Sequence, residues 1–349
     1  MQTARINEID ILRFLSAIAV MVFHYAFRGY TADGYSPLSY PMLFPIAKYG
    51  YLGVNLFFMI SGFVIMMTVS DGNMSRFLIS RFTRLYPAFW ACCTITFVVT
   101  SLFGESRLQI SLSNYLVNMT MLGGLFRVPL VDGVYWSLFV ELKFYAIVLA
   151  ILIAGQIRRI DTLLWLWLAV ALTARAVPSW TLQSIVIADY APLFIAGAVF
   201  SRIRFNGASA GRISLIAICW LVATYDEMAQ TAAVSAQFGV AFNAAAIGAT
   251  LSAFFAAMAL VACGRTGWVG RADWGTFGAM TYPLYLLHQN IGYVVFTRLY
   301  AFANQHLLFW GTVAFMLAAA YVIYVGVERR FAPIMRRALS RVHSDPNRV

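Results

Sequence analysis

Ionisable side chains interrupt the long apolar stretches of this 349-residue chain. Arg13 and His24 lie in the first stretch, Glu141 in a central one and His288 in a later one. Charged or titratable groups are costly inside a membrane and usually have a function there. Imidazole and carboxylate groups can also transfer protons. We therefore regard His24, Glu141, His288 and Arg13 as candidate catalytic residues.

The spacing of Arg13 and His24 predicts that they share one face of a helix. Eleven residues make about three turns and separate the side chains by about 16 Å. Lipid does not accept such a face, so it should look into the protein, with Arg13 in the inner half and His24 in the outer half. The alternative is that Arg13 snorkels inward and His24 lies near the outer headgroups. The alternative to a catalytic role is a structural ion pair for Glu141 and a packing role for His288.

Three cations, Arg76, Arg81 and Arg84, precede the third apolar stretch. Arg81 and Arg84 are three residues apart, which puts them on one side of a helical turn just before Pro87. Guanidinium groups bind phosphate through two parallel hydrogen bonds. This pattern predicts a clamp for a phosphorylated donor, although the three cations are also typical of a simple topology signal.

Two further residues are candidates for binding that donor. Ser61 and Gly62 interrupt the second apolar stretch, where small residues are alternatively explained by close helix packing. Tyr285 precedes His288 by three residues and shares its helix face. The candidate cofactor-binding residues are Arg76, Arg81, Arg84, Ser61 and Tyr285. We expect no metal site.

Composition indicates that these residues are positioned by membrane helices. The chain is 61% hydrophobic and 11% charged, and its mean hydropathy is +0.76. A soluble domain usually contains about 25% charged residues. The net charge of +11 does not indicate nucleic-acid binding, because the arginines fall between apolar runs rather than on one soluble basic face.

The apolar stretches predict an all-α, polytopic membrane protein. A spanning helix needs about 20 mostly apolar residues. About ten stretches qualify: 8–28, 46–69, 85–103, 133–154, 161–177, 184–201, 212–225, 237–262, 276–297 and 307–327. The shorter apolar segment 114–126 is interpreted as a re-entrant or interfacial piece.

Arginine is concentrated on alternate loops, which predicts the orientation. One set of loops and the C-terminal segment carry most of the arginines, whereas the opposite set is richer in acids. The positive-inside rule then places both termini in the cytoplasm. We expect one transmembrane domain over 1–328 and a basic, amphipathic tail over 329–349 on the inner membrane surface.

Five short motifs in this order resemble the acyltransferase-3 family of membrane-bound acyltransferases, and the likeness extends over nearly the whole chain. They are Arg13-x10-His24, Phe58-x2-Ser61-Gly62-Phe63, Arg81-x2-Arg84-x2-Pro87, Tyr135-Trp-Ser-Leu-x-Val-Glu141-x2-Phe-Tyr145 and Tyr282-x2-Tyr285-Leu-x-His288. Thr281 stands where serine is commoner. The soluble hydrolase-like domain that some members carry is missing, so we expect a stand-alone member.

The resemblance implies an O-acyltransferase of the bacterial inner (cytoplasmic) membrane. Its donor would be acyl-CoA, with acetyl-CoA the expected form, held through its phosphates by the arginines. The acceptor would be a hydroxyl of a cell-envelope carbohydrate or glycolipid, such as lipopolysaccharide O-antigen or exopolysaccharide. His24 would act as general base, either directly or through an acyl-histidine, with Glu141 orienting it. His288 or Tyr285 would position the acceptor or the oxyanion.

Two other classes of function remain open at this point. A secondary transporter would use His24, Glu141 and His288 as a proton relay. However, no inverted repeat is visible, and the arginine pair has no evident role in such a protein. A flippase-like partner without catalysis is the other alternative. Membrane lipids are expected partners in every case, and neither the acceptor nor the oligomeric state follows from the sequence.

Overall fold

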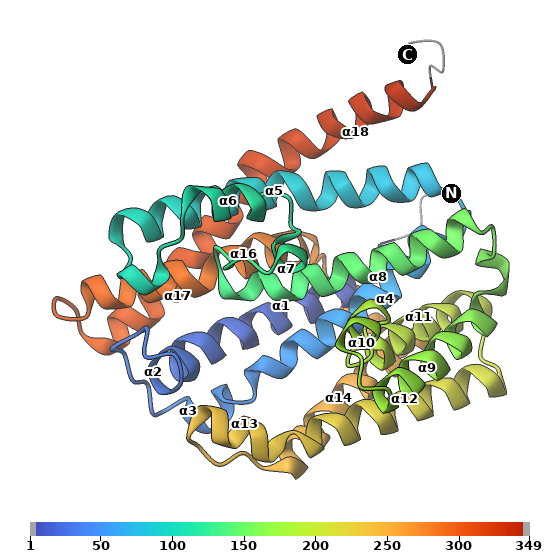
Figure 1. Ribbon diagram of the computed structural model, residues 1–349, viewed down its shortest axis with the longest axis horizontal. Coiled ribbons are helices and arrows are strands. Elements are labelled where there is room, and N and C mark those ends of the chain that lie inside the picture. Colours follow the sequence, from blue (N-terminus) through green and yellow to red (C-terminus); the bar gives the residue numbers. More distant parts are fainter. Residues whose placement is uncertain (1–4, 345–349) are drawn as a thin grey trace. The chain divides into compact units, whose positions relative to one another are not determined.

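The computed structural model describes residues 5–344, which are mostly helical and contain no strand (Figure 1). The all-α prediction is therefore confirmed for this part of the chain. The described residues form two compact units. The first comprises residues 5–16, 51–74 and 140–275, and the second residues 17–50, 75–139 and 276–344. The chain passes between the units within α1 (Asn7–Phe23) and within α8 (Trp136–Ile153).

The first unit is built around α11 (Ala191–Asn206), whose residues are buried continuously from Ala191 to Ser201. Helices α4, α9, α12 and α14 pack against it (Figure 1). The helices of this unit are α4 (Gly53–Thr68), α9 (Ile160–Ala176), α10 (Trp180–Ile185), α11, α12 (Ala210–Ala229), α13 (Thr231–Phe238), α14 (Ala244–Ala262) and α15 (Gly267–Gly270).

Two glycines bring α4 and α11 into backbone contact. A Cβ atom at Gly62 of α4 would collide with the carbonyl oxygen of Phe194, and one at Gly197 of α11 would collide with that of Met59. In lipid, helices associate through close packing of small residues. The packing interpretation of Gly62 is therefore correct.

The second unit contains most of α5 (Met74–Phe103) and α16 (Gly275–Leu299). Its other helices are α2 (Gly29–Thr31), α3 (Phe44–Ala47), α6 (Leu112–Asn118), α7 (Gly123–Phe126), α17 (Gln305–Ile323) and α18 (Arg329–Ser344). Two π-helical turns, His24–Arg28 (η1) and Tyr324–Glu328 (η6), follow α1 and α17.

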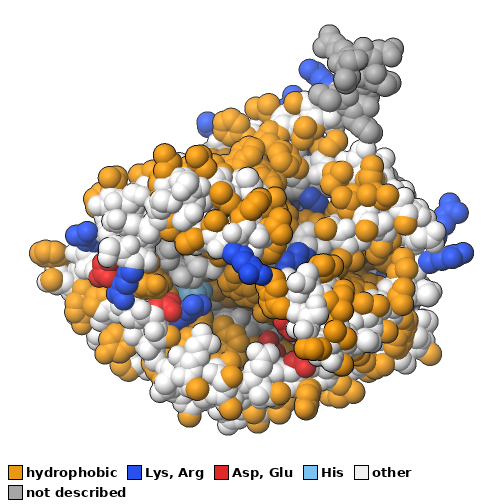
Figure 2. Space-filling model, in the orientation of Figure 1, with side chains coloured by type: hydrophobic (Ala, Val, Ile, Leu, Met, Phe, Trp, Pro, Cys, Tyr) orange, Lys and Arg blue, Asp and Glu red, His pale blue; other side chains and the backbone are white. Residues whose placement is uncertain are grey.

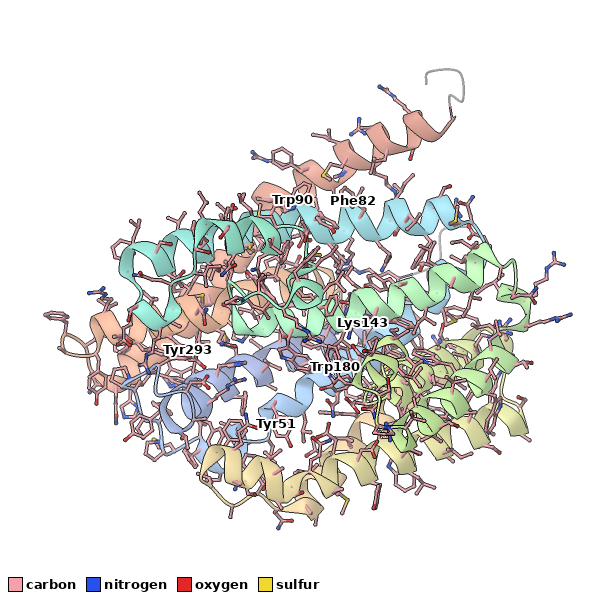
Figure 3. All side chains as sticks on the ribbon, in the orientation of Figure 1. Tyr51, Phe82, Trp90, Lys143, Trp180 and Tyr293 are labelled. Atoms are coloured by element: carbon pink, nitrogen blue, oxygen red, sulfur yellow. The ribbon has the colours of Figure 1, made fainter. Side chains whose placement is uncertain are left out.

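The apolar segment 114–126 lies along α5. Phe97 stacks on Tyr115 with ring centroids 4.3 Å apart. Tyr86 and Trp90 donate hydrogen bonds to the carbonyl oxygens of Thr120 and Met119. Figure 3 labels Trp90 on α5. The segment is thus two short helices held to α5 by aromatic side chains, rather than one continuous element.

Six helical stretches of the described residues are long and apolar enough to cross a membrane: Asn7–Thr31, Phe44–Thr68, Met74–Phe103, Gly133–Ile153, Ala244–Ala262 and Gln305–Arg341. They indicate a multi-pass membrane protein. The remaining predicted spans coincide with α9, α11, α12 and α16. The count of ten spans stays a prediction, and both termini lie outside the described residues.

Two predicted boundaries are wrong. The stretch 184–201 was expected to be one helix, but α11 begins only at Ala191. Ile187 interrupts it with a φ of 55°, and Pro192 then occupies the first turn of α11. The stretch 237–262 is likewise broken after Phe238. There Gly239 ends α13 in a left-handed conformation and Asn243 caps α14.

The exposed side chains of the helices are largely apolar, as lipid contact requires. Leu102, Leu221, Phe315 and Val322 are each more than half exposed. Figure 2 shows hydrophobic side chains over much of the visible face, with few charged ones between them. A water-facing surface of this composition would associate with other molecules, so the surface supports membrane insertion.

The basic tail begins with α18, an amphipathic helix that continues from α17 through η6. Its apolar side includes Phe331 and Ile334, which are 51% and 56% exposed. The predicted boundary between 328 and 329 coincides with the end of η6. Residues 345–349 of the predicted tail lie outside the described residues.

The α4–α11 contact yields a prediction about stability. Gly62→Ala should destabilise the protein by about 1–3 kcal/mol, because the new methyl group forces two backbones apart. Gly211→Ala is the matched control, since nothing lies within 4 Å of a Cβ atom there. Thermal unfolding in detergent measures both variants, and equal melting temperatures would contradict the close-contact interpretation.

Candidate active site

His24 is the first residue of the π-helical turn η1, which begins where the regular α-helix α1 ends. The N–H of Gly29 donates to the carbonyl oxygen of His24, five residues earlier. A Cβ atom at Gly29 would lie 2.5 Å from the ring of Tyr293, a residue of α16 labelled in Figure 3. Single π-helical turns occur frequently at functional sites. Here the turn carries a buried histidine.

The second unit brings His24 and His288 together. Nδ1 of His24 lies 3.1 Å from Nε2 of His288, and the ring centroids are 4.9 Å apart. The side chains are 4% and 0% exposed. The sequence placed both residues in the outer half of the membrane, and the structure shows that they are direct neighbours.

The surrounding carbonyl groups determine where the ring protons lie. Nδ1 of His288 is 2.9 Å from the carbonyl oxygen of Tyr285. Because a carbonyl only accepts, this Nδ1 must carry the proton, and Nε2 of neutral His288 is an acceptor. Nδ1 of His24 is 2.8 Å from the carbonyl oxygen of Val20 and therefore also carries its proton. It points this N–H at Val20 and His288.

These assignments leave Nε2 of neutral His24 with a free lone pair. No hydrogen bond to this atom is seen within residues 5–344. A histidine whose Nδ1–H is held by acceptors and whose Nε2 is unprotonated has the form required of a general base.

Three side chains hold the backbone of α16 around His288. Tyr25 donates to the carbonyl oxygen of His288 over 2.6 Å, and Tyr135 to that of Leu286 over 3.2 Å. Asp132 accepts from the N–H of Asn290 over 3.0 Å. The segment of α16 that carries His288 is therefore held by hydrogen bonds to Tyr25 of η1 and to Asp132 and Tyr135, which precede α8.

Asp132 is fully buried directly before the apolar span Gly133–Ile153. Its carboxylate also accepts from the N–H of Val134 over 3.2 Å. Burial raises the pKa of Asp132 from 3.8 to about 7, against the lowering effect of these two N–H groups and of Arg28. The carboxyl group therefore titrates near neutral pH.

Tyr285 and Ser137 join α16 to α8. Their hydroxyl groups are 2.7 Å apart, and the Tyr285 hydroxyl also donates to the carbonyl oxygen of Val134. Tyr285 is therefore held by protein partners in this structure. Its predicted contact with the donor or the oxyanion stays a prediction.

Glu141 and Ser61 are brought together in the first unit. Ser61 and Tyr145 each donate a hydrogen bond of 2.6 Å to the same carboxylate oxygen of Glu141. Neither donor is an ion, so a structural ion pair is not what these contacts show. Glu141 and His24 belong to different units, and their predicted interaction stays a prediction. Arg13 is half-buried on α1, also in the first unit.

The three predicted phosphate-binding arginines lie in the first turns of helix α5, which agrees with the helical turn expected for Arg81 and Arg84. Helix α5 begins at Met74 and includes Pro87 in its interior. Nε of Arg81 is buried without a hydrogen-bond partner in the described structure. Arg84 is half-buried, and among the described residues it makes no hydrogen bond or ion pair. Arg76 is exposed one turn earlier. Arg81 and Arg84 are therefore available to an anion.

No group of three or more His, Cys, Asp or Glu side chains within residues 5–344 is arranged to hold a metal ion. The chemistry available from the described side chains is proton transfer at His24 and anion binding at α5.

Comparison with protein families agrees with this arrangement. The profile of a family described as an acyltransferase domain matches residues 6–325. The chain belongs to the acyltransferase-3 family. The acyltransferase interpretation is thus confirmed, and the transporter alternative is not supported. No curated protein and no solved structure gives a significant match.

Several residues that shape this acyltransferase site were missed from the sequence. Asp132 was not a candidate, although it lies only three residues before the fourth motif. Tyr25 and Asn290 each follow a motif histidine by one or two residues, but neither was considered. Polar residues flanking the motifs were the available signal. Their partners lie more than 150 residues away along the chain.

The pKa of Asp132 predicts a pH-dependent stability. Between pH 3.8 and about 7 the folded protein retains a proton that the unfolded chain has lost. The free energy of unfolding should therefore fall as pH rises through this window. Asp132→Asn cannot titrate and should flatten that decline. Melting temperatures of both proteins from pH 4.5 to 7.5 test this, and parallel curves would refute it.

Proposed function

We propose that this acyltransferase moves an acyl group, expected to be acetyl, from acyl-CoA to a hydroxyl of a cell-envelope carbohydrate at the bacterial cytoplasmic membrane. The observation that carries the proposal is the His24–His288 pair. It presents a buried imidazole with its Nε2 lone pair free, which an O-acyl transfer needs at the acceptor hydroxyl.

In the proposed reaction, Nε2 of His24 removes the hydroxyl proton as the acceptor oxygen attacks the thioester carbonyl carbon. The carbon–sulfur bond then breaks, and coenzyme A leaves as a thiolate that takes up the proton. The imidazolium formed at His24 has two N–H groups. Nδ1–H already points at Val20 and at the unprotonated Nε2 of His288. Both acceptors favour the charged ring, as the carboxylate does in a catalytic triad.

The donor phosphates are proposed to bind at Arg81 and Arg84. Both guanidinium groups retain unused donors, and they lie on the first turns of α5, which the charge distribution predicts on the cytoplasmic side. Acyl-CoA is made in the cytoplasm and carries several phosphate charges, so a basic inner end suits it. Ser61 stays a predicted donor contact, and Glu141 a predicted catalytic residue.

The arginine assignment predicts a selective loss of donor binding. Arg84→Ala should weaken acetyl-CoA binding by about tenfold, since it removes charge-assisted hydrogen bonds to phosphate. Arg84→Lys should restore it only in part, because an ammonium group lacks the planar fork. Arg265→Ala removes an exposed cation elsewhere and is the control. Calorimetric titration with acetyl-CoA gives the affinities, and equal affinities in all variants would exclude this site.

The assignment of His24 as the general base predicts a loss of acyl transfer without a loss of donor binding. His24→Ala should reduce transfer of radiolabelled acetyl groups to envelope glycan by roughly 100-fold or more, while acetyl-CoA still binds. His288→Gln keeps an acceptor for the Nδ1–H and should lose less activity than His288→Phe. Rates are compared per folded molecule. A folded His24→Ala protein with full activity would disprove the mechanism.

A further inference from the structure

The first unit contains a cavity of about 420 Å³ that the acyl-transfer chemistry does not use. It lies between the end of α4, the start of α9 and the end of α11. The polar residues of its lining are Ser70, Arg158, Ser201, Arg202 and Asn206. The rest of the lining is apolar and includes Met66, Ile157 and Phe205. One cavity thus offers both a cationic and an apolar side.

Two side chains supply unused hydrogen-bond donors. Arg158 is exposed at the cavity and has no ion pair or hydrogen bond among the described residues. Ser201 lines the cavity, and its hydroxyl group makes no hydrogen bond in the described part of the chain. A ligand that accepts hydrogen bonds from both side chains would therefore fit this cavity.

Neighbouring charges also favour an anion. Asp161 is engaged by Arg202 at 3.0 Å and by Arg212 at 2.6 Å. Arg202 additionally donates to Asn206. The acidic residues near the cavity, Asp71 and Asp161, are outnumbered by arginines.

We propose that this cavity binds the phosphate headgroup of an anionic phospholipid. The phosphate would accept from Arg158 and Ser201, while the glycerol and upper acyl chain would lie against the apolar side. A free phosphate would leave that apolar side unused. The arginine-rich loops place the cavity on the predicted cytoplasmic side, where basic pockets between helices bind anionic headgroups. The proposal is independent of the acyl donor and acceptor.

Native mass spectrometry of delipidated protein, titrated with phosphatidylglycerol or phosphatidylcholine of equal chain length, tests the site. One phosphatidylglycerol should bind in preference to phosphatidylcholine. Arg158→Ala should weaken its binding by about tenfold, and Ser201→Ala by a smaller factor. Arg159→Ala is the matched control, because this neighbouring exposed arginine does not line the cavity. It should change binding by less than about twofold.

Three results would overturn the proposal. Equal binding of the two lipids would show that the phosphate charge is not recognised. Equal losses in Arg158→Ala and Arg159→Ala would attribute binding to general surface charge. Displacement of phosphatidylglycerol by excess inorganic phosphate or coenzyme A, dependent on Arg158, would identify a site for a soluble phosphate instead. Acyl-transfer activity of the same preparations is measured separately, so that failure of one assignment leaves the other testable.

Discussion

The hydrogen bond from Nδ1 of His288 to the carbonyl oxygen of Tyr285 is the interaction on which the candidate active site depends. It places a proton on Nδ1 and so makes Nε2 of His288 an acceptor. That acceptor, together with the carbonyl oxygen of Val20, holds the Nδ1–H of His24 and leaves Nε2 of His24 free for a substrate proton. If His288 carried its proton on the other nitrogen, two N–H groups would face each other. The chemistry therefore rests on helix carbonyls as much as on side chains.

This arrangement requires α16 to be fixed against η1, and the local structure explains how. Tyr25 is one residue after His24, and its hydroxyl group reaches the carbonyl oxygen of His288. A Cβ atom at Gly292 would collide with the Tyr25 ring. The glycine therefore permits the approach that brings the two histidines within 3.1 Å. These buried polar groups satisfy one another, and their mutual hydrogen bonds make the geometry specific.

The sequence allowed the helical class, most helix positions and the candidate residues to be predicted, because apolar length and ionisable interruptions are local signals. It failed where tertiary contacts decide. The positive φ of Ile187 interrupts the stretch 184–201, which its apolar composition predicted to be one helix. The hydrogen bond from Ser61 to Glu141, 80 residues later, was not foreseen either. Asp132 was not singled out, because its partner, the N–H of Asn290, lies 158 residues away along the chain.

The arginines show how far a net charge of +11 can be interpreted. Their distribution over the loops predicted the orientation of the chain in the membrane. The structure adds that some arginines form ion pairs and others do not. Arg175 is bound to Asp226 at 2.6 Å, and Arg202 and Arg212 share Asp161. These arginines join helix ends within the first unit. Arg84 and Arg158 have no such acid within the described residues. A guanidinium group kept beside apolar surface without a carboxylate gains most from an anion that arrives with the substrate or the membrane. The two proposed phosphate sites therefore rest on where an unpaired arginine lies, at a motif or in a cavity, and not on total charge.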